Sequence, residues 1–167
     1  MHNELTRKDI EDMEAEIEHR KVVVRKELLE HVKEARSLGD LSENFEYYAA
    51  KKEKNKNESR IRYLERMIRT ATILDDDSKD DEVGINKTIT VYVEEDDVEE
   101  QYKIVTTVRE DSLNGLVSNE SPMGKALLGH KVGDRVFIEV NKDYGYYAVI
   151  RKIDNTTVDD AGMLRDY

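Results

Sequence analysis

The 167-residue chain is 39% charged and 38% hydrophobic, with a formal net charge of −11 at pH 7. This composition is too charged for one thick globular core and fits a helical rod joined to a small domain. The acidic balance excludes broad wrapping of bare nucleic acid, because phosphate contacts need lysine and arginine. The lack of cysteine excludes disulfides and thiolate metal sites, and no apolar run reaches membrane-spanning length, so we expect a soluble, cytoplasmic protein without a membrane partner.

Residues 5–37 are predicted to form one helix. Apolar residues at three- and four-residue spacing, with charged residues between them, mark its buried face: Ile10, Met13, Ile17, Val24, Leu28, Val32 and Ala35. Thr6 is a plausible N-cap, with Asp9 three residues later completing a local cap. A helix of this length makes a rod of about 45 Å.

A second helix is predicted from about residue 42 to residue 74. Ser42 is expected to cap its start, with Phe45 and Tyr48 packing near that end. Its far end regains the apolar spacing, whereas residues 51–59 contain almost no apolar side chain. Because the connection between the two helices is short, they must lie antiparallel. We therefore expect a coiled-coil hairpin that is firm at its base and tip and weak in the middle.

Beyond the hairpin the pattern alternates, as in strands. Strands are predicted in five segments: residues 88–93, 101–108, 116–117, 135–140 and 146–153. Ser121 and Pro122 open a brief helix, with serine as N-cap and proline at the first helical position. The fold class is therefore α+β, a helical hairpin followed by a small antiparallel β domain with one short helix. The expected segments are a hairpin at 1–76, a linker at 77–84, a β domain at 85–154 and a loose polar tail at 155–167.

The hairpin tip carries the most informative residues. Gly39 interrupts the helical pattern, and Asp40 and Glu43 follow within a turn. Two carboxylates held near each other at the end of a rod can reach a distant site and share a hard cation such as Mg²⁺ there. The alternative is that both acids simply favour the start of the second helix.

Two stretches resemble one known family. The first is the tip run Gly39-Asp40-Leu41-Ser42-Glu43-Asn44, followed by Glu46-Tyr47 and Ala49-Ala50. The second is the run Ser121-Pro122-Met123-Gly124-Lys125-Ala126-Leu127-Leu128-Gly129, with Lys131-Val132-Gly133-Asp134 after it. Together, and in this order, they resemble the signatures of the Gre transcript-cleavage factors, GreA and GreB, and are most similar to GreA. The resemblance covers nearly the whole chain.

The resemblance implies a function in transcription elongation. An FKBP-like C-terminal domain would dock on RNA polymerase through Glu120, Ser121 and Pro122, although Ser121 and Pro122 also read as an ordinary helix cap. The hairpin would pass down the secondary channel to the 3′ end of backtracked nascent RNA. There Asp40 and Glu43 would help hold the second Mg²⁺ and its water. The chain alone would be no enzyme, would need no cofactor and would be a monomer.

Other tip residues are candidate contacts. The resemblance implies that Arg36, Ser42, Asn44, Lys51 and Lys52 meet RNA or polymerase, with a solvated helix face as the alternative for Lys52. The tip aromatics could stack on a nucleotide, although packing at the hairpin end is the ordinary role: Phe45, Tyr47 and Tyr48. The histidines lack metal-ligand spacing and are expected on the surface or in the seam: His2, His19, His31 and His130.

Three other functions stay open. The chain could be an inhibitor of RNA polymerase built on the same scaffold, although the tip has only Asp40, Glu43 and Glu46 as acids. It could be a coiled-coil adaptor whose β domain binds a peptide or isomerises prolines, which a prolyl-isomerase assay would reveal. An independent metal-dependent nuclease is disfavoured because too few ligands cluster in the sequence.

Overall fold

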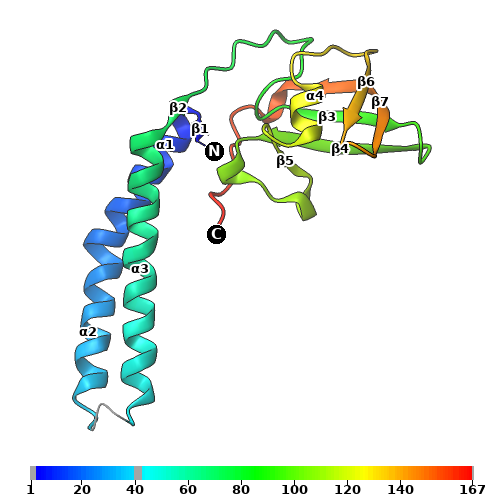
Figure 1. The fold of residues 1–167 in the computed structure, drawn as a ribbon. Coiled ribbons are helices and arrows are strands. Elements are labelled where there is room, and N and C mark those ends of the chain that lie inside the picture. The colour runs from blue at the N-terminus through cyan, green and yellow to red at the C-terminus, as the bar shows by residue number, and fades with distance from the viewer. Residues whose placement is uncertain (1–2, 40–42, 167) are drawn as a thin grey trace. The chain divides into compact units, whose positions relative to one another are not determined.

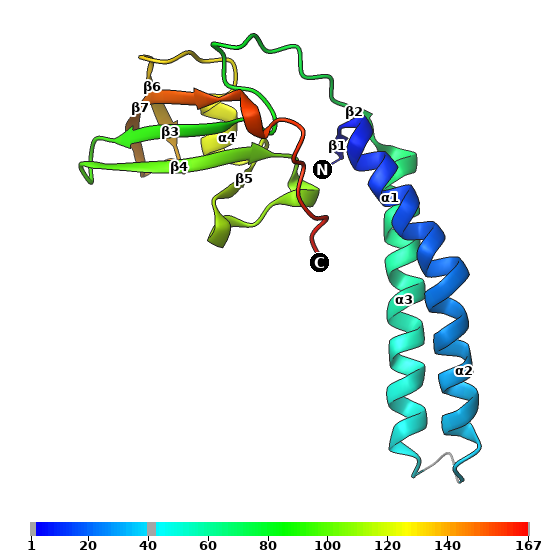
Figure 2. The same ribbon diagram turned by 180° about the vertical axis from the view of Figure 1, so that it is seen from behind.

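The computed structural model describes residues 3–39 and 43–166. It comprises two compact units (Figures 1 and 2). One unit is residues 10–71, a helical hairpin. The other starts at residue 72, runs to the end of the chain and includes the N-terminal residues up to Asp9. Among the described helices, none has the length and apolar character required to cross a membrane.

The first arm of the hairpin is helical along its whole length but is not one uniform helix. It consists of three consecutive segments: α1 (Arg7–His19), a π-helical segment (Arg20–Val24) and α2 (Arg25–Arg36). The predicted cap is confirmed, because the Thr6 backbone N–H donates to Asp9 Oδ2 at 2.9 Å and the Asp9 N–H donates to Thr6 Oγ1 at 3.1 Å. These reciprocal bonds satisfy backbone donors that a helix start leaves open. The π-helical segment was not predicted.

The second arm is α3 (Phe45–Thr70), which runs antiparallel to the first (Figure 1). It starts later than predicted, with Asn44 as its N-cap, and the predicted cap Ser42 lies outside the described residues. It also ends earlier. Thr72–Ile73, which were expected to be helical, form strand β2. This strand pairs in parallel with β1 (Glu4–Leu5), where Leu5 was expected to begin the first helix. Threonine and isoleucine suit an extended backbone, and the pairing places Leu5 in a fully buried position.

The seam between the two arms is apolar only near its ends. Met13, Ile61 and Leu64 are buried toward the base, and Ala35 packs with Tyr47 and Ala50 at the tip. The middle of α3 lacks apolar side chains, as predicted, and charged and amide side chains of the two arms contact each other across the seam there. The middle is therefore joined by polar contacts.

The second unit contains a five-stranded sheet in the order β5-β4-β3-β7-β6. The strands are β3 (Thr88–Val93), β4 (Val98–Val105), β5 (Leu116–Ser118), β6 (Arg135–Glu139) and β7 (Gly145–Asp154). Four of the five were predicted within a few residues, but β4 starts three residues early and ends at Val105. The expectation of a purely antiparallel sheet is wrong, because β4 and β5 pair in parallel. Two short 3₁₀ turns, Thr107–Arg109 and Ser112–Asn114, carry the chain back between these strands.

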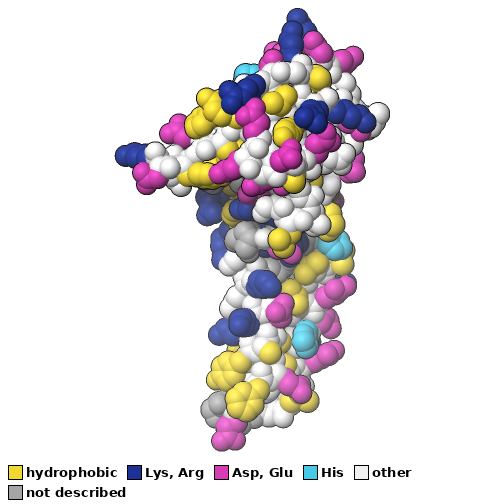
Figure 3. Space-filling view, turned by 90° about the vertical axis from the view of Figure 1, so that its right-hand side faces the viewer, with side chains coloured by type: hydrophobic (Ala, Val, Ile, Leu, Met, Phe, Trp, Pro, Cys, Tyr) yellow, Lys and Arg dark blue, Asp and Glu magenta, His cyan; other side chains and the backbone are white. Residues whose placement is uncertain are grey.

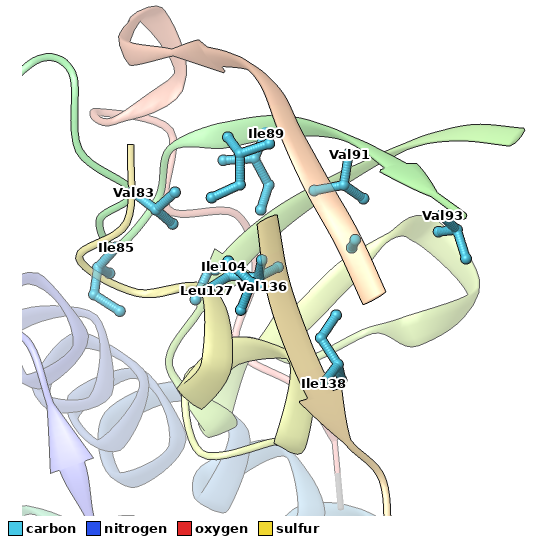
Figure 4. Packing of buried hydrophobic residues seen from close by; sticks show 11 residues of the cluster. Val83, Ile85, Ile89, Val91, Val93, Ile104, Leu127, Val136 and Ile138 are labelled. Atoms are coloured by element: carbon cyan, nitrogen blue, oxygen red, sulfur yellow. The ribbon is translucent and has the colours of Figure 1, made fainter. Parts of the chain in front are cut away.

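The core of this unit lies between the sheet and α4 (Pro122–Leu127). In β3 the alternate residues Ile89, Val91 and Val93 are buried, the pattern of a strand with one face in a core. Figure 4 shows Leu127 of α4 near Ile104 and Val136 of the sheet. The α4 helix therefore contributes its buried leucine to the same core as the strands.

The C-terminal tail was expected to be loose, and its contacts correct that expectation. The Arg109 side chain donates to the Gly162 carbonyl at 2.7 Å, and the Arg165 N–H donates to the Val108 carbonyl at 2.8 Å. Ala161 is buried. The tail is polar in sequence, but its backbone groups and one small side chain dock onto the turn after β4. Such partners are distant in sequence, so composition alone could not indicate them.

Candidate functional site

The candidate site is the tip of the hairpin. At the end of α2, Ser37 Oγ donates to the Glu34 carbonyl at 2.6 Å, and the Leu38 N–H donates to the Ala35 carbonyl at 3.2 Å. Gly39 then adopts φ of 137°, a conformation that side chains other than glycine rarely take. The predicted break at Gly39 is therefore confirmed. Two predicted site residues, Asp40 and Ser42, lie outside the described residues.

Asn44 closes the tip by contacting both helices. Its Oδ1 accepts from the Tyr47 N–H at 3.1 Å and so caps α3, while its Nδ2 donates to the Ala35 carbonyl in the last turn of α2 at 2.5 Å. Sequence reasoning treated Asn44 as a contact to RNA or polymerase and missed this role. Asparagine is among the best N-cap residues, and its place just before Phe45-Glu46 was the available signal.

Tyr47 is the aromatic side chain that packs at the tip. It is 9% exposed and stands beside Arg36, whose Nη2 donates to the phenol oxygen at 3.5 Å and whose guanidinium lies 5.5 Å from the ring centre. The hydrogen bond from Arg36, together with the charges of Lys51, Arg36 and Lys54, lowers the pKa of Tyr47 against the opposing effect of burial. Positive charge therefore acts on the Tyr47 hydroxyl, and Arg36 is one of the side chains that supply it.

Phe45 and Tyr48 were expected to pack at the tip. This is wrong for Phe45, whereas the Tyr48 ring packs edge-on against the Tyr47 ring, with 5.5 Å between the ring centres. Phe45 is 84% exposed and Tyr48 is half exposed. The reason is helical spacing, because the buried positions of α3 follow from Tyr47 through Ala50 to Asn57 and place Phe45 off that stripe. An exposed ring at the end of the hairpin keeps nucleotide stacking open as a prediction.

Glu43 is the described acid of the predicted pair. Its side chain is exposed, and no other described residue forms a hydrogen bond or ion pair with it. An uncommitted carboxylate is the hard oxygen donor that Mg²⁺ prefers, so Glu43 fits the proposed metal. Within residues 3–39 and 43–166, no three histidine, cysteine or acidic side chains come together in a way that could hold a metal ion.

The space-filling view shows how charge divides along the hairpin. Lysine and arginine side chains gather along one side, while acidic and histidine side chains lie along the other, and hydrophobic side chains are exposed close to the tip (Figure 3). Lys51 and Lys52, both predicted contacts, are exposed. The described histidines are surface residues as expected, and His2 lies outside the described residues.

The predicted docking loop lies in the other unit. Ser121 is the N-cap of α4, since its Oγ accepts from the Gly124 N–H at 3.0 Å and donates to the Ser118 carbonyl at 2.6 Å. Pro122 follows at the first helical position and is exposed. The capping prediction is confirmed. Gly124 has no room for a side chain, because a Cβ there would lie 2.2 Å from the Ser118 carbonyl.

Glu120 is held in place by its neighbours. Its Oε2 accepts from Thr107 Oγ1 at 2.9 Å, and its N–H donates to Ser118 Oγ at 3.0 Å. Thr107 and Ser118 in turn share a buried hydrogen bond of 2.6 Å. The loop therefore presents Glu120 and Pro122 from a backbone fixed on both sides.

Comparisons with known proteins identify the family. Two family models match, one described as transcription elongation factor, N-terminal, over residues 3–73, and one as transcription elongation factor, GreA/GreB, C-term, over residues 77–154. Transcription elongation factor GreA of Macrococcus caseolyticus is 48% identical over 132 residues, which are 79% of this chain and 84% of that protein. The chain belongs to the GreA/GreB family of transcription elongation factors. The resemblance seen in its two motifs is thereby confirmed.

Other members of the GreA/GreB family give similar values. GreA of Geobacillus kaustophilus is 46% identical over 136 residues, and GreA of Bacillus subtilis is 44% identical over 135 residues, each match covering 81% of this chain and 86% of the relative. Among solved structures, GreA factor homolog 1 of Thermus thermophilus is 24% identical, with 93% of this chain and all of that chain covered and a TM-score of 0.42. The roles of individual tip and loop residues remain predictions within this family.

Proposed function

We propose that this GreA/GreB family member acts on RNA polymerase and stimulates the polymerase's own cleavage of backtracked nascent RNA. The observation that carries the proposal is the exposed Glu43 carboxylate, which no other described residue binds, at the end of a helical hairpin that Asn44 closes. Within residues 3–39 and 43–166 no cluster of acidic and histidine side chains could hold a metal ion, and the relatives are named as elongation factors. The chain therefore donates its tip groups to the polymerase and acts as a factor. It works as a monomer.

The hairpin gives the tip its reach. The 26 residues of α3 span about 39 Å, enough to carry a few side chains down a narrow channel. Asn44 fixes the end of α3 against the end of α2, and Glu43 is the residue just before it. The backbone that carries Glu43 is therefore tied at its C-terminal side. A backbone held in this way loses less conformational entropy when its side chain meets a target.

Asp40 and Glu43 would hold Mg²⁺ jointly with acids of the polymerase. When bound there, the metal would polarise a phosphoryl oxygen and activate water for hydrolysis. Two carboxylates suffice for this contribution because Mg²⁺ usually keeps several waters and takes only one or two protein carboxylates. The chain's own part would be to position two oxygen donors.

Basic side chains near the tip bind the RNA or the channel wall. Arg36, Lys51 and Lys52 are exposed around the tip, and their positive charge attracts phosphates. Arg36 is also oriented by Tyr47. Ser42 and Asn44 complete the predicted contact set. Docking on the polymerase surface uses the fixed loop of Glu120, Ser121 and Pro122.

The test is a cleavage assay with a stalled, backtracked elongation complex. Adding the purified protein with Mg²⁺ should shorten the nascent RNA from its 3′ end, and the same RNA without polymerase should stay intact. Hydrolysis of free RNA by the isolated protein would contradict the proposal. Inhibition of RNA synthesis without any cleavage would instead support the inhibitor alternative.

A further inference from the structure

The middle of the hairpin seam buries an asparagine. Asn57 is 3% exposed in the interior of α3, at a position where seams usually carry apolar side chains. Arg20 Nη1 donates to its Oδ1 at 2.9 Å, and its Nδ2 lies 3.4 Å from the Arg20 carbonyl oxygen. Both contacts cross from one arm to the other, and both involve the same residue.

A charged network extends this contact toward the base. Glu16 accepts from Arg20 Nε at 2.7 Å on its own arm and from Arg60 Nε at 2.8 Å on the other. Burial would raise the pKa of Glu16, but hydrogen bonds from Arg60 and Arg20 outweigh it and lower the pKa. Glu16 is therefore ionised at neutral pH. These groups satisfy each other only when the two arms are aligned in this way.

The π-helical segment begins at the residue that Asn57 contacts. In it the Arg25 N–H donates to the Arg20 carbonyl, five residues back instead of four. Such a segment inserts an extra residue into the turn and rotates everything that follows about the helix axis. The buried positions of α2 are therefore shifted around the helix axis relative to those of α1, compared with an uninterrupted α-helix. Both can face α3 at once only if the arms are correctly aligned along the seam.

We propose that Asn57 is a positioning residue that fixes the axial register of α3 against the first arm and thereby the location of the tip carboxylates. The expected effect on cleavage rests on the proposed function, whereas the effect of Asn57 on the register rests on the seam contacts alone. Residues 51–59 offer no apolar side chains to specify a register by shape. A slip by one helical turn would move one helix end by about 5.4 Å. Catalytic geometry does not tolerate errors of that size.

The first test compares three variants in the cleavage assay. Asn57→Leu removes the hydrogen bonds with Arg20 but supplies an apolar seam side chain, so the hairpin should stay folded. The helical signal in circular dichroism checks this. We expect its maximal cleavage rate at saturating protein to fall at least about tenfold, while the half-saturating concentration stays within about twofold. Asn57→Asp can still accept from Arg20 and should recover most of the rate. Asn55→Leu, the same change at an exposed position two residues away, should behave as the wild type.

The second test measures register without polymerase. The chain has no cysteine, so an engineered pair reports alignment directly. Ala35→Cys is combined in turn with Ala50→Cys, from the same buried cluster, or with Glu46→Cys or Lys54→Cys, each one turn away. When Asn57 is unchanged, oxidation should form a disulfide most readily in the protein that combines Ala35→Cys with Ala50→Cys. Asn57→Leu should shift disulfide formation toward a cysteine pair one turn away, whereas Asn55→Leu should leave the preferred pair unchanged.

The two tests separate this inference from the proposed function. If the wild-type protein fails to stimulate cleavage, the proposed function is wrong, and the cysteine pattern still decides whether Asn57 sets the register. An unchanged pattern in Asn57→Leu would overturn the inference. A changed pattern with a wild-type cleavage rate would also overturn it, because register would then not govern the tip.

Discussion

Asn44 joins the ends of two helices with one side chain. Its oxygen caps α3 and its nitrogen binds the last turn of α2. Asn44→Ala should destabilise the hairpin by about 0.5–2 kcal/mol, because it removes the N-cap and leaves the Ala35 carbonyl without this donor. Asn44→Asp keeps the capping oxygen and should cost less. Urea unfolding followed by circular dichroism measures both, and equal stability of all three proteins would contradict the assigned role.

Arg109 is a deeply buried charged side chain of the second unit. It pairs with Asp9 at 2.5 Å, and both side chains are 1% exposed. Arg109→Met should destabilise this unit by about 3–5 kcal/mol, since it leaves the Asp9 carboxylate buried without its cation. Arg165→Met is the matched control. Its pair with Glu110 is exposed, and its loss should cost less than about 1 kcal/mol. Similar losses of unfolding free energy in the two variants would show that burial does not determine how strongly these ion pairs stabilise the protein.

The same residues show what sequence could and could not indicate. Thr6 and Asp9 were recognised as a cap because a cap depends on spacing alone. The pairing of Asp9 with Arg109, a hundred residues away, leaves no local trace. The capping role of Asn44 was missed for a different reason, and its predicted contact with RNA or polymerase stays a prediction. Its motif suggested a contact with another molecule, while its capping chemistry was visible from residue type and position.

At the scale of elements, local periodicity predicted best. The alternation of β3 and the cap of α4 are set by neighbouring residues and were anticipated to within a residue. The errors arose where distant segments compete for the chain. Thr72–Ile73 leave the helix because β1 offers a partner, and β5 turns parallel to β4 because of the turns between them. Partners of this kind are chosen by tertiary packing.

The hairpin seam should weaken in acid. Burial would raise the pKa of Glu16, but its bonds to Arg60 and Arg20 prevail and lower it, and the hydrogen bond from Arg25 lowers the pKa of Glu58. Folded-state pKa values below the ordinary 4.5 mean that the unfolded chain binds these protons more readily. Their stabilisation is complete above that value and is lost as the pH falls through the folded-state pKa values.

The measurement is the denaturant midpoint of the helical signal as a function of pH. The wild-type midpoint should fall on acidification below the ordinary glutamate pKa, and the double variant Glu16→Gln with Glu58→Gln should show a flatter dependence. Glu53→Gln, at an exposed position of α3, is the control and should retain the wild-type slope. Identical slopes in all three proteins would show that these bonds do not stabilise the seam.

At the scale of the whole molecule, the tail belongs to the fold. Deleting residues 159–167 removes the Gly162 carbonyl from Arg109 and the Arg165 contacts with Val108 and Glu110. A buried donor left without its acceptor costs about 1–3 kcal/mol. We expect the shortened protein to be cleaved faster in limited proteolysis within its β unit. Unchanged proteolysis would mean that the tail contacts contribute nothing to stability.

Much of the fold could be predicted from the sequence, because the apolar residues of the two units repeat with different periods and each unit carries its own motif. The α+β class, the hairpin and the family followed from these patterns. The mixed sheet, the docked tail and the buried asparagine in the seam did not, since each depends on a partner far along the chain. At the site, the breaker Gly39 and the exposed Glu43 agree with expectation, while Asp40 and Ser42 remain predictions.

The central claim is that tip carboxylates, and not the hairpin alone, stimulate cleavage. The direct measurement compares Asp40→Asn, Glu43→Gln and the control Glu53→Gln with a backtracked elongation complex, recording polymerase affinity and cleavage rate separately. The two tip variants should bind normally and lose most of the stimulated rate, with partial recovery at higher Mg²⁺, because a missing oxygen ligand weakens metal occupancy. Glu53→Gln should match the wild type. Normal binding with a wild-type cleavage rate in both tip variants would contradict the mechanism.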